Sequence, residues 1–121
     1  MSRQEVTGKR SLEFSKWIHD KLPDSCTGFT VTNLDWVFWN YKNRILLISE
    51  EKMYKGKLPF FQSQIFKEIL APALKEYCEN HDIQFLGFHL IQFENTSPKD
   101  GKIWWDGNEI SETELIDRLS W

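Results

Sequence analysis

The feature that most constrains the fold is an aliphatic run that leads directly into charged residues. Residues 45–48 are all aliphatic, and Glu50 and Lys52 follow them. Such a run is typical of a central strand that is buried on both faces of a sheet. Successive side chains of a strand point to opposite faces, so Glu50 and Lys52 project from the same face. The run therefore predicts a strand over residues 44–51 that presents a carboxylate and an ammonium group at its end.

A further acidic residue opens the preceding segment. Residues 35–39 are mainly aromatic, which favours a strand, and the turn at residues 41–43 folds this strand back beside the next one. We therefore expect Asp35 to meet Glu50 and Lys52 at the end of a hairpin. Two carboxylates can bind a hard cation, and the ammonium group lies beside them. This is the combination that a metal-dependent phosphodiesterase needs.

The rest of the chain alternates between helical and extended patterns. Helices are expected at residues 11–22, 61–80 and from 111 onward, and further strands at residues 29–32, 83–93 and 102–105. Pro72 falls inside the second helix and should kink it or split it in two. Ser111 and Glu114 have the spacing of a capping box at the start of the last helix. This order predicts an α/β protein with a mixed sheet flanked by helices.

The length and composition are those of a small globular protein. At 121 residues the chain is long enough for one core, so we expect a single domain over residues 1–121, with residues 1–10 flexible. Cys26 and Cys78 lie far apart and form no metal-ligand pattern with the histidines, which is typical of reduced thiols in a cytoplasmic protein. We also expect no secretory signal and no membrane partner, because no segment is apolar over a sufficient length.

The net charge of the chain differs from that of proteins that coat nucleic acid without regard to sequence. The formal net charge is −3, so any binding of nucleic acid depends on local positive charge. Basic residues occur on both sides of the predicted site, at Lys42, Arg44, Lys55 and Lys57. We expect them to hold phosphates, although a solvated turn and loop would have the same composition.

Aromatic residues offer a second kind of contact. Trp104 and Trp105 are adjacent, so they point to opposite faces of a strand. One of them is expected in the core. The other, together with Trp121, is expected either to stack on a base or to close a dimer interface.

The element order and the acidic motifs resemble those of the PD-(D/E)xK nuclease superfamily, which includes restriction endonucleases and Holliday-junction resolvases. The resemblance covers roughly residues 11–93, with Asp35 opening one strand and Glu50-x-Lys52 ending the next. Leu34 departs from the pattern, since a proline often stands there in the superfamily. The resemblance implies a restriction-endonuclease-like α-β-β-β-α-β core, extended here by a C-terminal strand and helix.

The resemblance also implies roles for the residues of the motifs. Asp35 and Glu50 would bind Mg²⁺ or Mn²⁺, the backbone carbonyl of Glu51 would be a further ligand, and Lys52 would act on the attacking water. The residues alone also allow a simpler interpretation, in which Glu50 and Lys52 form only a surface ion pair.

Two further positions match parts of the superfamily. Glu13 would be a carboxylate on the first helix, and Gln62 or Gln64 would be a glutamine on the second. The alternative for Glu13 is an acidic residue in the first helical turn that stabilises the helix dipole. The alternative for the glutamines is simple exposure to solvent.

The function implied by this resemblance is a metal-dependent nuclease that hydrolyses DNA, with branched, nicked or otherwise structured DNA as the substrate. A homodimer is expected, because cutting two strands needs two sites. Two alternatives stay open. The first is a nuclease fold without activity that binds a protein or nucleic acid, which the acidic charge and aromatic content favour. The second is a nuclease directed at RNA.

Overall fold

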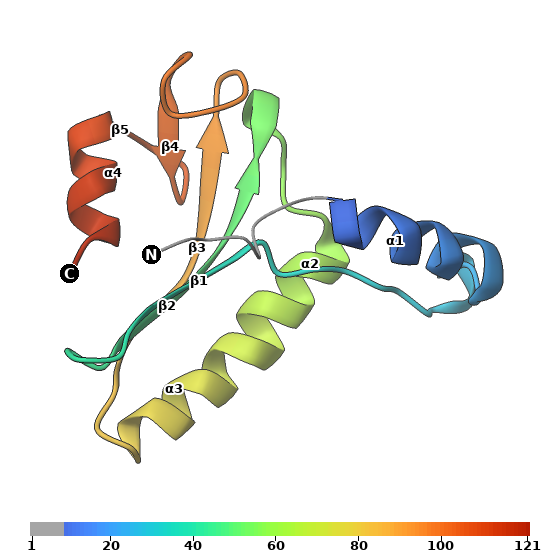
Figure 1. Ribbon diagram of the computed structural model, residues 1–121, viewed down its shortest axis with the longest axis horizontal. Helices are drawn as coiled ribbons and strands as arrows, with labels where there is room; N and C mark the ends of the chain where they lie inside the picture. Colours follow the sequence, from blue (N-terminus) through green and yellow to red (C-terminus); the bar gives the residue numbers. More distant parts are fainter. Residues whose placement is uncertain (1–8) are drawn as a thin grey trace. The chain divides into compact units, whose positions relative to one another are not determined.

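The computed structural model describes residues 9–121, with side chains from residue 13 onward except Ser25. The chain divides into two compact units, residues 1–31 and 32–121. The first unit holds helix α1 (Lys9–Lys21) and the short helical turn η2 (Ser25–Thr27) (Figure 1). The predicted first helix is confirmed, with ends shifted by one or two residues. The prediction of one domain stays a prediction, and the flexible segment predicted over residues 1–10 lies mostly outside the described residues.

A mixed sheet is the centre of the second unit. Within the described part of the chain, five strands pair in the order β1-β2-β3-β4-β5. They are β1 (Trp36–Asn40), β2 (Ile45–Lys52), β3 (Gln84–Phe93), β4 (Ile103–Trp105) and β5 (Asn108–Ile110). β2 and β3 are parallel because a long helical segment connects them, whereas the other neighbours are antiparallel. The α/β class is therefore confirmed, while the restriction-endonuclease-like form of it stays a prediction.

One predicted strand is wrong, and one observed strand was not predicted. Residues 29–32, although described, form no strand, so only two strands precede the long helical segment instead of the predicted three. Strand propensity depends on a paired neighbour, and no strand of the described sheet lies beyond β1. β5 was not among the strands expected from the sequence. The turn needs only Asp106 and Gly107, whose φ angles of 49° and 88° suit a two-residue hairpin.

The long helical segment is continuous despite Pro72. It consists of α2 (Phe60–Ser63), the π-helix η4 (Gln64–Leu70) and α3 (Ala71–Glu79). Pro72 does not split it, because the turn that precedes the proline is wider than an α-turn. There the Ala71 N–H bonds the carbonyl of Phe66, five residues earlier. The wide turn makes room for a ring that would clash with the carbonyl of a regular α-helix.

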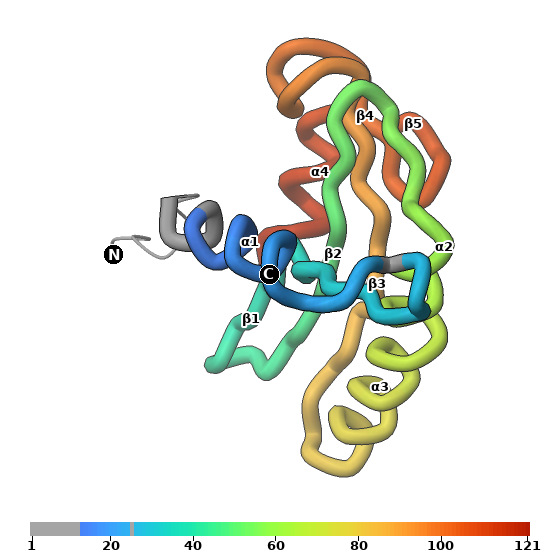
Figure 2. The backbone as a smooth tube through the Cα atoms, turned by 90° about the vertical axis from the view of Figure 1, so that its right-hand side faces the viewer, coloured from blue at the N-terminus to red at the C-terminus, as the bar shows by residue number. Residues whose placement is uncertain are grey.

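The two faces of the sheet are covered by different helices. Figure 2 shows α4 (Glu112–Leu119) on one side of β2 and β3, and the α2–α3 segment on the other. The α4 face carries a buried apolar cluster of Leu47, Ile91, Phe93, Ile103, Trp105, Ile110 and Leu115. On the α2–α3 face, Phe66 stacks on Phe88 with ring centroids 5.5 Å apart. The capping box of Ser111 and Glu114 is confirmed at the start of α4.

None of the helices in the described part of the chain is both long and apolar enough to span a membrane.

Candidate functional site

Two carboxylates meet at the junction of β1 and β2. Trp36 pairs with Ser49, so Asp35, just before β1, lies opposite Glu50. The Asp35 N–H donates to Glu50 Oε1 at 2.7 Å, and the Glu51 N–H donates to Asp35 Oδ2 at 3.0 Å. The backbone of each strand thus holds the carboxylate of the other. The hairpin expected from the sequence brings these two acids together as predicted.

Lys52 completes the cluster and is held by a glutamine. Its Nζ lies 3.8 Å from Glu50 Oε2 and donates to Gln62 Oε1 at 2.9 Å. Because an ammonium group can only donate, the Gln62 oxygen must face Lys52. The Gln62 amide then donates to Thr32 Oγ1 at 2.8 Å. We call Asp35, Glu50, Lys52 and Gln62 the acidic cluster.

The structure distinguishes the two candidate glutamines. Gln62 is only 8% exposed and contacts Lys52, whereas Gln64 is exposed. Thr32 was missed in the sequence, because nothing in the local pattern indicates that this residue lies against α2. Its contribution depends on how the segment before β1 passes the helix.

Glu50 is the least ordinary member of the cluster, because it is a carboxylate with 1% exposure. Burial raises the pKa of Glu50 to about 7 from 4.5, and the neighbouring Asp35 carboxylate adds to the rise. The hydrogen bond from the Asp35 N–H and the charge of Lys52 act in the opposite direction. A cation bound beside both acids would favour the ionised form of Glu50.

Glu51 lies on the opposite face of β2 from Glu50. Its side chain accepts a hydrogen bond from Trp36 Nε1 at 3.1 Å. Its carboxylate therefore points away from the acidic cluster. Only the backbone carbonyl of Glu51 remains as a candidate ligand, which is the group that the resemblance implies.

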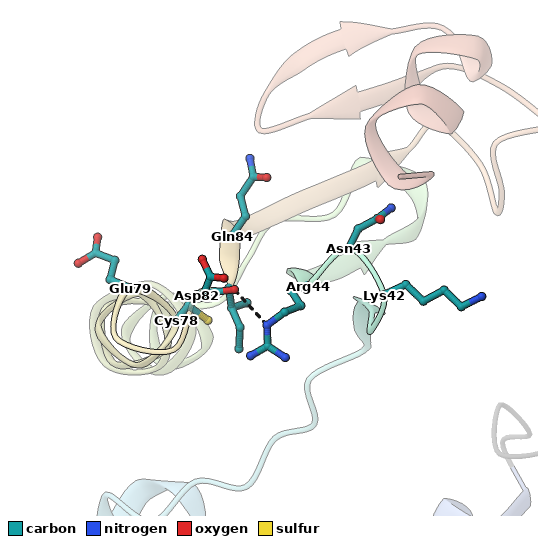
Figure 3. Close-up of a pocket in the computed structure, with 8 residues that line it drawn as sticks. Lys42, Asn43, Arg44, Cys78, Glu79, Asp82 and Gln84 are labelled. Carbon is teal, nitrogen blue, oxygen red and sulfur yellow. Dashed lines mark hydrogen bonds between the residues drawn. The ribbon is translucent and has the colours of Figure 1, made fainter.

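The structure does not bring Lys42 and Arg44 to the acidic cluster. Both precede β2, whose eight residues separate them from Lys52 by about 26 Å at the usual strand rise. Arg44 Nη2 donates to the carbonyl of His81 and Nε to that of Asp82, at 2.8 and 3.1 Å. Figure 3 shows Arg44 directed at this loop and Lys42 directed away from it. The expectation that both residues surround the site is wrong, because Arg44 anchors the loop between α3 and β3.

Lys55 and Lys57 lie in the loop that follows Lys52. Lys55 ends the short helix η3 (Met53–Lys55), and its Nζ lies 4.4 Å from the ring centroid of Trp104. Trp105 is buried and Trp104 partly exposed, so the expectation that one of the pair is core is confirmed. Gln92, which the sequence analysis did not single out, donates to the carbonyl of Gly56 at 2.9 Å and fixes this loop to β3.

Glu13 lies on α1, in the unit of residues 1–31, and is exposed. It is the fifth residue of the helix, and the first turn of α1 holds no acidic residue. The alternative that Glu13 stabilises the helix dipole from the first turn is therefore wrong. Its role in the site stays a prediction.

The oxygen atoms of the cluster suit a hard divalent cation. Asp35, Glu50 and the Glu51 carbonyl are the kinds of ligand that Mg²⁺ takes, with water and phosphate filling its other positions. Among the described residues, no group of three or more His, Cys, Asp or Glu side chains gathers as a metal site. A site with two carboxylates and one carbonyl would contain only two such side chains.

Comparisons with models of protein families, with curated proteins and with solved structures gave no match to this chain. The functional interpretation therefore depends on the arrangement of the residues described above.

Proposed function

We propose that this chain is a metal-dependent nuclease that hydrolyses phosphodiester bonds in DNA. The observation that carries the proposal is the buried carboxylate of Glu50, held beside Asp35 and Lys52 at the end of β2. Burial of an ion pair costs several kcal/mol per ion in desolvation, and apolar residues of similar volume are often as good or better for stability. A role in folding alone therefore accounts poorly for charges at this position.

Asp35 and Glu50 would hold Mg²⁺ or Mn²⁺, with the carbonyl of Glu51 as a third ligand. When bound, the cation neutralises charge on the scissile phosphate and makes a water molecule more acidic. Lys52 holds a positive charge beside the carboxylates, where it stabilises the negative charge that develops on the phosphate and orients the attacking water. Gln62 keeps the Lys52 ammonium group in this position through its side-chain oxygen.

The surroundings of the cluster support a polyanionic substrate. Lys55 and Lys57 lie three and five residues after Lys52, so positive charge continues along the loop away from the site. Contacts of this kind neutralise neighbouring phosphates without reading the sequence. We also propose that the chain acts as a homodimer, in which each copy cuts one of the two strands.

The test is cleavage of labelled nucleic acids by the full chain in Mg²⁺, Mn²⁺ or EDTA. The panel holds single-stranded DNA, duplex DNA, a flap, a four-way junction and RNA. We expect metal-dependent cutting of DNA that Lys52→Ala and Asp35→Asn each lower on the order of a hundredfold or more. Lys42→Ala is the matched control, because Lys42 is an exposed lysine at the other end of β2.

No cutting of any substrate by the parent chain, with either metal, would contradict the proposal and favour a binding module. Cutting confined to RNA would replace DNA by RNA as the substrate. Equal losses in Lys52→Ala and Lys42→Ala would show that the acidic cluster is not the site of cleavage.

A further inference from the structure

A cavity of about 560 Å³ lies on the α2–α3 face of the sheet. It is lined by Phe88, Leu90 and Gln92 of β3, by Lys67 and Ala71 of the long helical segment, and by Asp106 and Gly107 of the turn before β5. In the parallel pairing of the two strands, Leu90 lies opposite Glu50 and Gln92 opposite Lys52. Paired strands are about 4.8 Å apart, so the cavity begins one strand away from the proposed site of hydrolysis.

The lining of the cavity combines apolar and polar groups in about equal measure. Phe88, Leu90 and Ala71 provide apolar surface. Gln92 provides a carboxamide whose orientation is fixed by its hydrogen bond to the Gly56 carbonyl. Lys67 is an exposed lining residue and supplies a positive charge. A flat, polar-edged ring matches such a lining, and the volume is in the range of small-molecule sites.

Asp106 also lines the cavity, and its negative charge is compensated. Its Oδ2 lies 2.6 Å from His89 Nδ1, and its Oδ1 accepts from the Leu90 N–H at 2.8 Å. His89 Nε2 lies 2.6 Å from the carbonyl of Leu86, so both ring nitrogens face acceptors, as in an imidazolium. Burial lowers the pKa of His89, but the hydrogen bonds to Asp106 and Leu86 outweigh it and raise the pKa. Asp106 therefore does not repel an anionic substrate as a free carboxylate would.

We propose that this cavity binds the base of an unpaired nucleotide next to the scissile phosphate, so that the substrate is DNA with an unpaired base at the cut. The proposal rests on the proposed function and names its substrate class. A base inside a duplex must first leave the stack, which costs a few kcal/mol, whereas an unpaired base is already free to enter. The cavity thus selects bulged, flapped or branched DNA without any contact that depends on sequence.

The test is the binding of DNA duplexes that contain 2-aminopurine, either as a single-nucleotide bulge or fully paired. It uses the full chain with Lys52→Ala, so that binding is measured without cleavage. Ala71→Phe places a ring in the cavity. Ala73→Phe is the matched control, because Ala73 is exposed on the same helix and does not line the cavity.

We expect the Lys52→Ala chain to bind the bulged duplex more tightly than the paired one, with a change in 2-aminopurine fluorescence. Ala71→Phe should weaken the bulged complex about tenfold, the size of one lost base stack, and leave the paired complex unchanged. Ala73→Phe should bind like its parent, and circular dichroism melts confirm that each variant is folded. A second measurement uses the chain with its natural Ala71, so it does not depend on whether Ala71→Phe folds. In that chain, a bulged 5-iodouracil should crosslink to the peptide that contains Phe88.

Equal affinity for bulged and paired duplexes, unchanged binding in Ala71→Phe, or a crosslink outside the cavity would each overturn the proposal. These outcomes leave the nuclease proposal intact, since they do not measure cleavage. Specific binding of the bulge by a chain whose natural form never cuts DNA would support the cavity and refute the nuclease.

Discussion

Leu47 and Glu50 lie on opposite faces of β2 and are equally buried, but their surroundings differ chemically. On the α4 face, Leu47 is 1% exposed and belongs to an entirely apolar cluster. On the α2–α3 face, Glu50 is also 1% exposed, but its neighbours are Asp35, Lys52 and Gln62. Apolar burial contributes about 25 cal/mol per Å², whereas a buried charge must recover its lost hydration from hydrogen bonds and ion pairs. The apolar cluster around Leu47 therefore stabilises the fold, whereas the acidic cluster around Glu50 is maintained against the cost of burying its charges.

The largest expected effect on stability is on the apolar face. Leu47→Ala should lower the free energy of unfolding by about 2–5 kcal/mol, because it leaves a cavity in a packed cluster. Val37→Ala is the control, since Val37 is an apolar residue of β1 with 59% exposure and should change stability by less than about 0.5 kcal/mol. Urea unfolding measures both. Similar urea midpoints for the two variants would mean that the apolar cluster on the α4 face does not stabilise the fold.

At Glu50, in contrast, removing the charge of the side chain is expected to raise the free energy of unfolding at high pH. The pKa of Glu50 is about 7 in the folded chain and 4.5 without burial, so the folded state binds this proton more tightly. The free energy of unfolding should therefore fall as pH rises from about 4.5 to about 7, and stay low above it. Glu50→Gln, which carries no titrating group, should be more stable than the parent at pH 8 by an amount on the order of 3 kcal/mol.

Urea unfolding at pH 5 and pH 8 checks this sign, with Glu109→Gln as the control because Glu109 is exposed on β5. A parent chain that gains stability between pH 5 and pH 8, while Glu50→Gln is less stable than it at pH 8, would show that the ionised Glu50 stabilises the fold. The burial of Glu50 would then stabilise the fold, as the burial of Leu47 does.

A smaller effect is expected for the glutamine that joins the cluster to α2. Gln62→Leu removes the partner of both Lys52 and Thr32, and should destabilise the chain by about 1–3 kcal/mol. Gln64→Leu is the matched control, two residues away and exposed. Thermal melts of the two variants give the comparison. If Gln64→Leu is destabilised as much as Gln62→Leu, the effect comes from the helix and not from the hydrogen bonds.

The smallest effect concerns Ser49, which lies two residues after Leu47 and therefore on the same face of β2. Its side chain is fully buried, and its Oγ has no hydrogen-bond partner among the described residues. Ser49→Ala should raise the free energy of unfolding by about 1 kcal/mol, because an unpaired buried hydroxyl is unfavourable. Ser97→Ala is the contrast, since the Ser97 hydroxyl accepts from the Lys99 N–H and its loss should not stabilise. A destabilised Ser49→Ala would mean that the hydroxyl is paired in solution.

The parts of the site that depend on local pattern could be predicted from the sequence. The alternation of side chains and one short turn are enough to place Asp35 opposite Glu50 and Lys52 beside Glu50. Residues 29–32 have strand propensity, but a strand also needs a paired neighbour, and local sequence does not show whether one is present. The contact of Gln62 with Thr32 likewise depends on how distant segments pack.

The contacts of Arg44 could not be predicted from the sequence either. Its position next to β2 suggested a phosphate contact. The parallel pairing of β2 with β3 brings the loop after α3 to the start of β2, and the carbonyls of His81 and Asp82 take up the guanidinium group. That loop is 37 residues or more away in the sequence, so the spacing around Arg44 alone could not indicate it.

The most direct test of the charged face is a calorimetric titration of the full chain with Mg²⁺ and with Mn²⁺ at pH 8 and at pH 6. We expect binding to the parent chain that weakens at pH 6, where Glu50 is mostly protonated and a proton must be released for each cation bound. Glu50→Gln should bind neither metal, and Glu109→Gln should bind both as the parent does. A parent chain that binds neither metal, or a Glu50→Gln variant that binds as tightly as the parent, would contradict the account that Asp35 and Glu50 form a metal site.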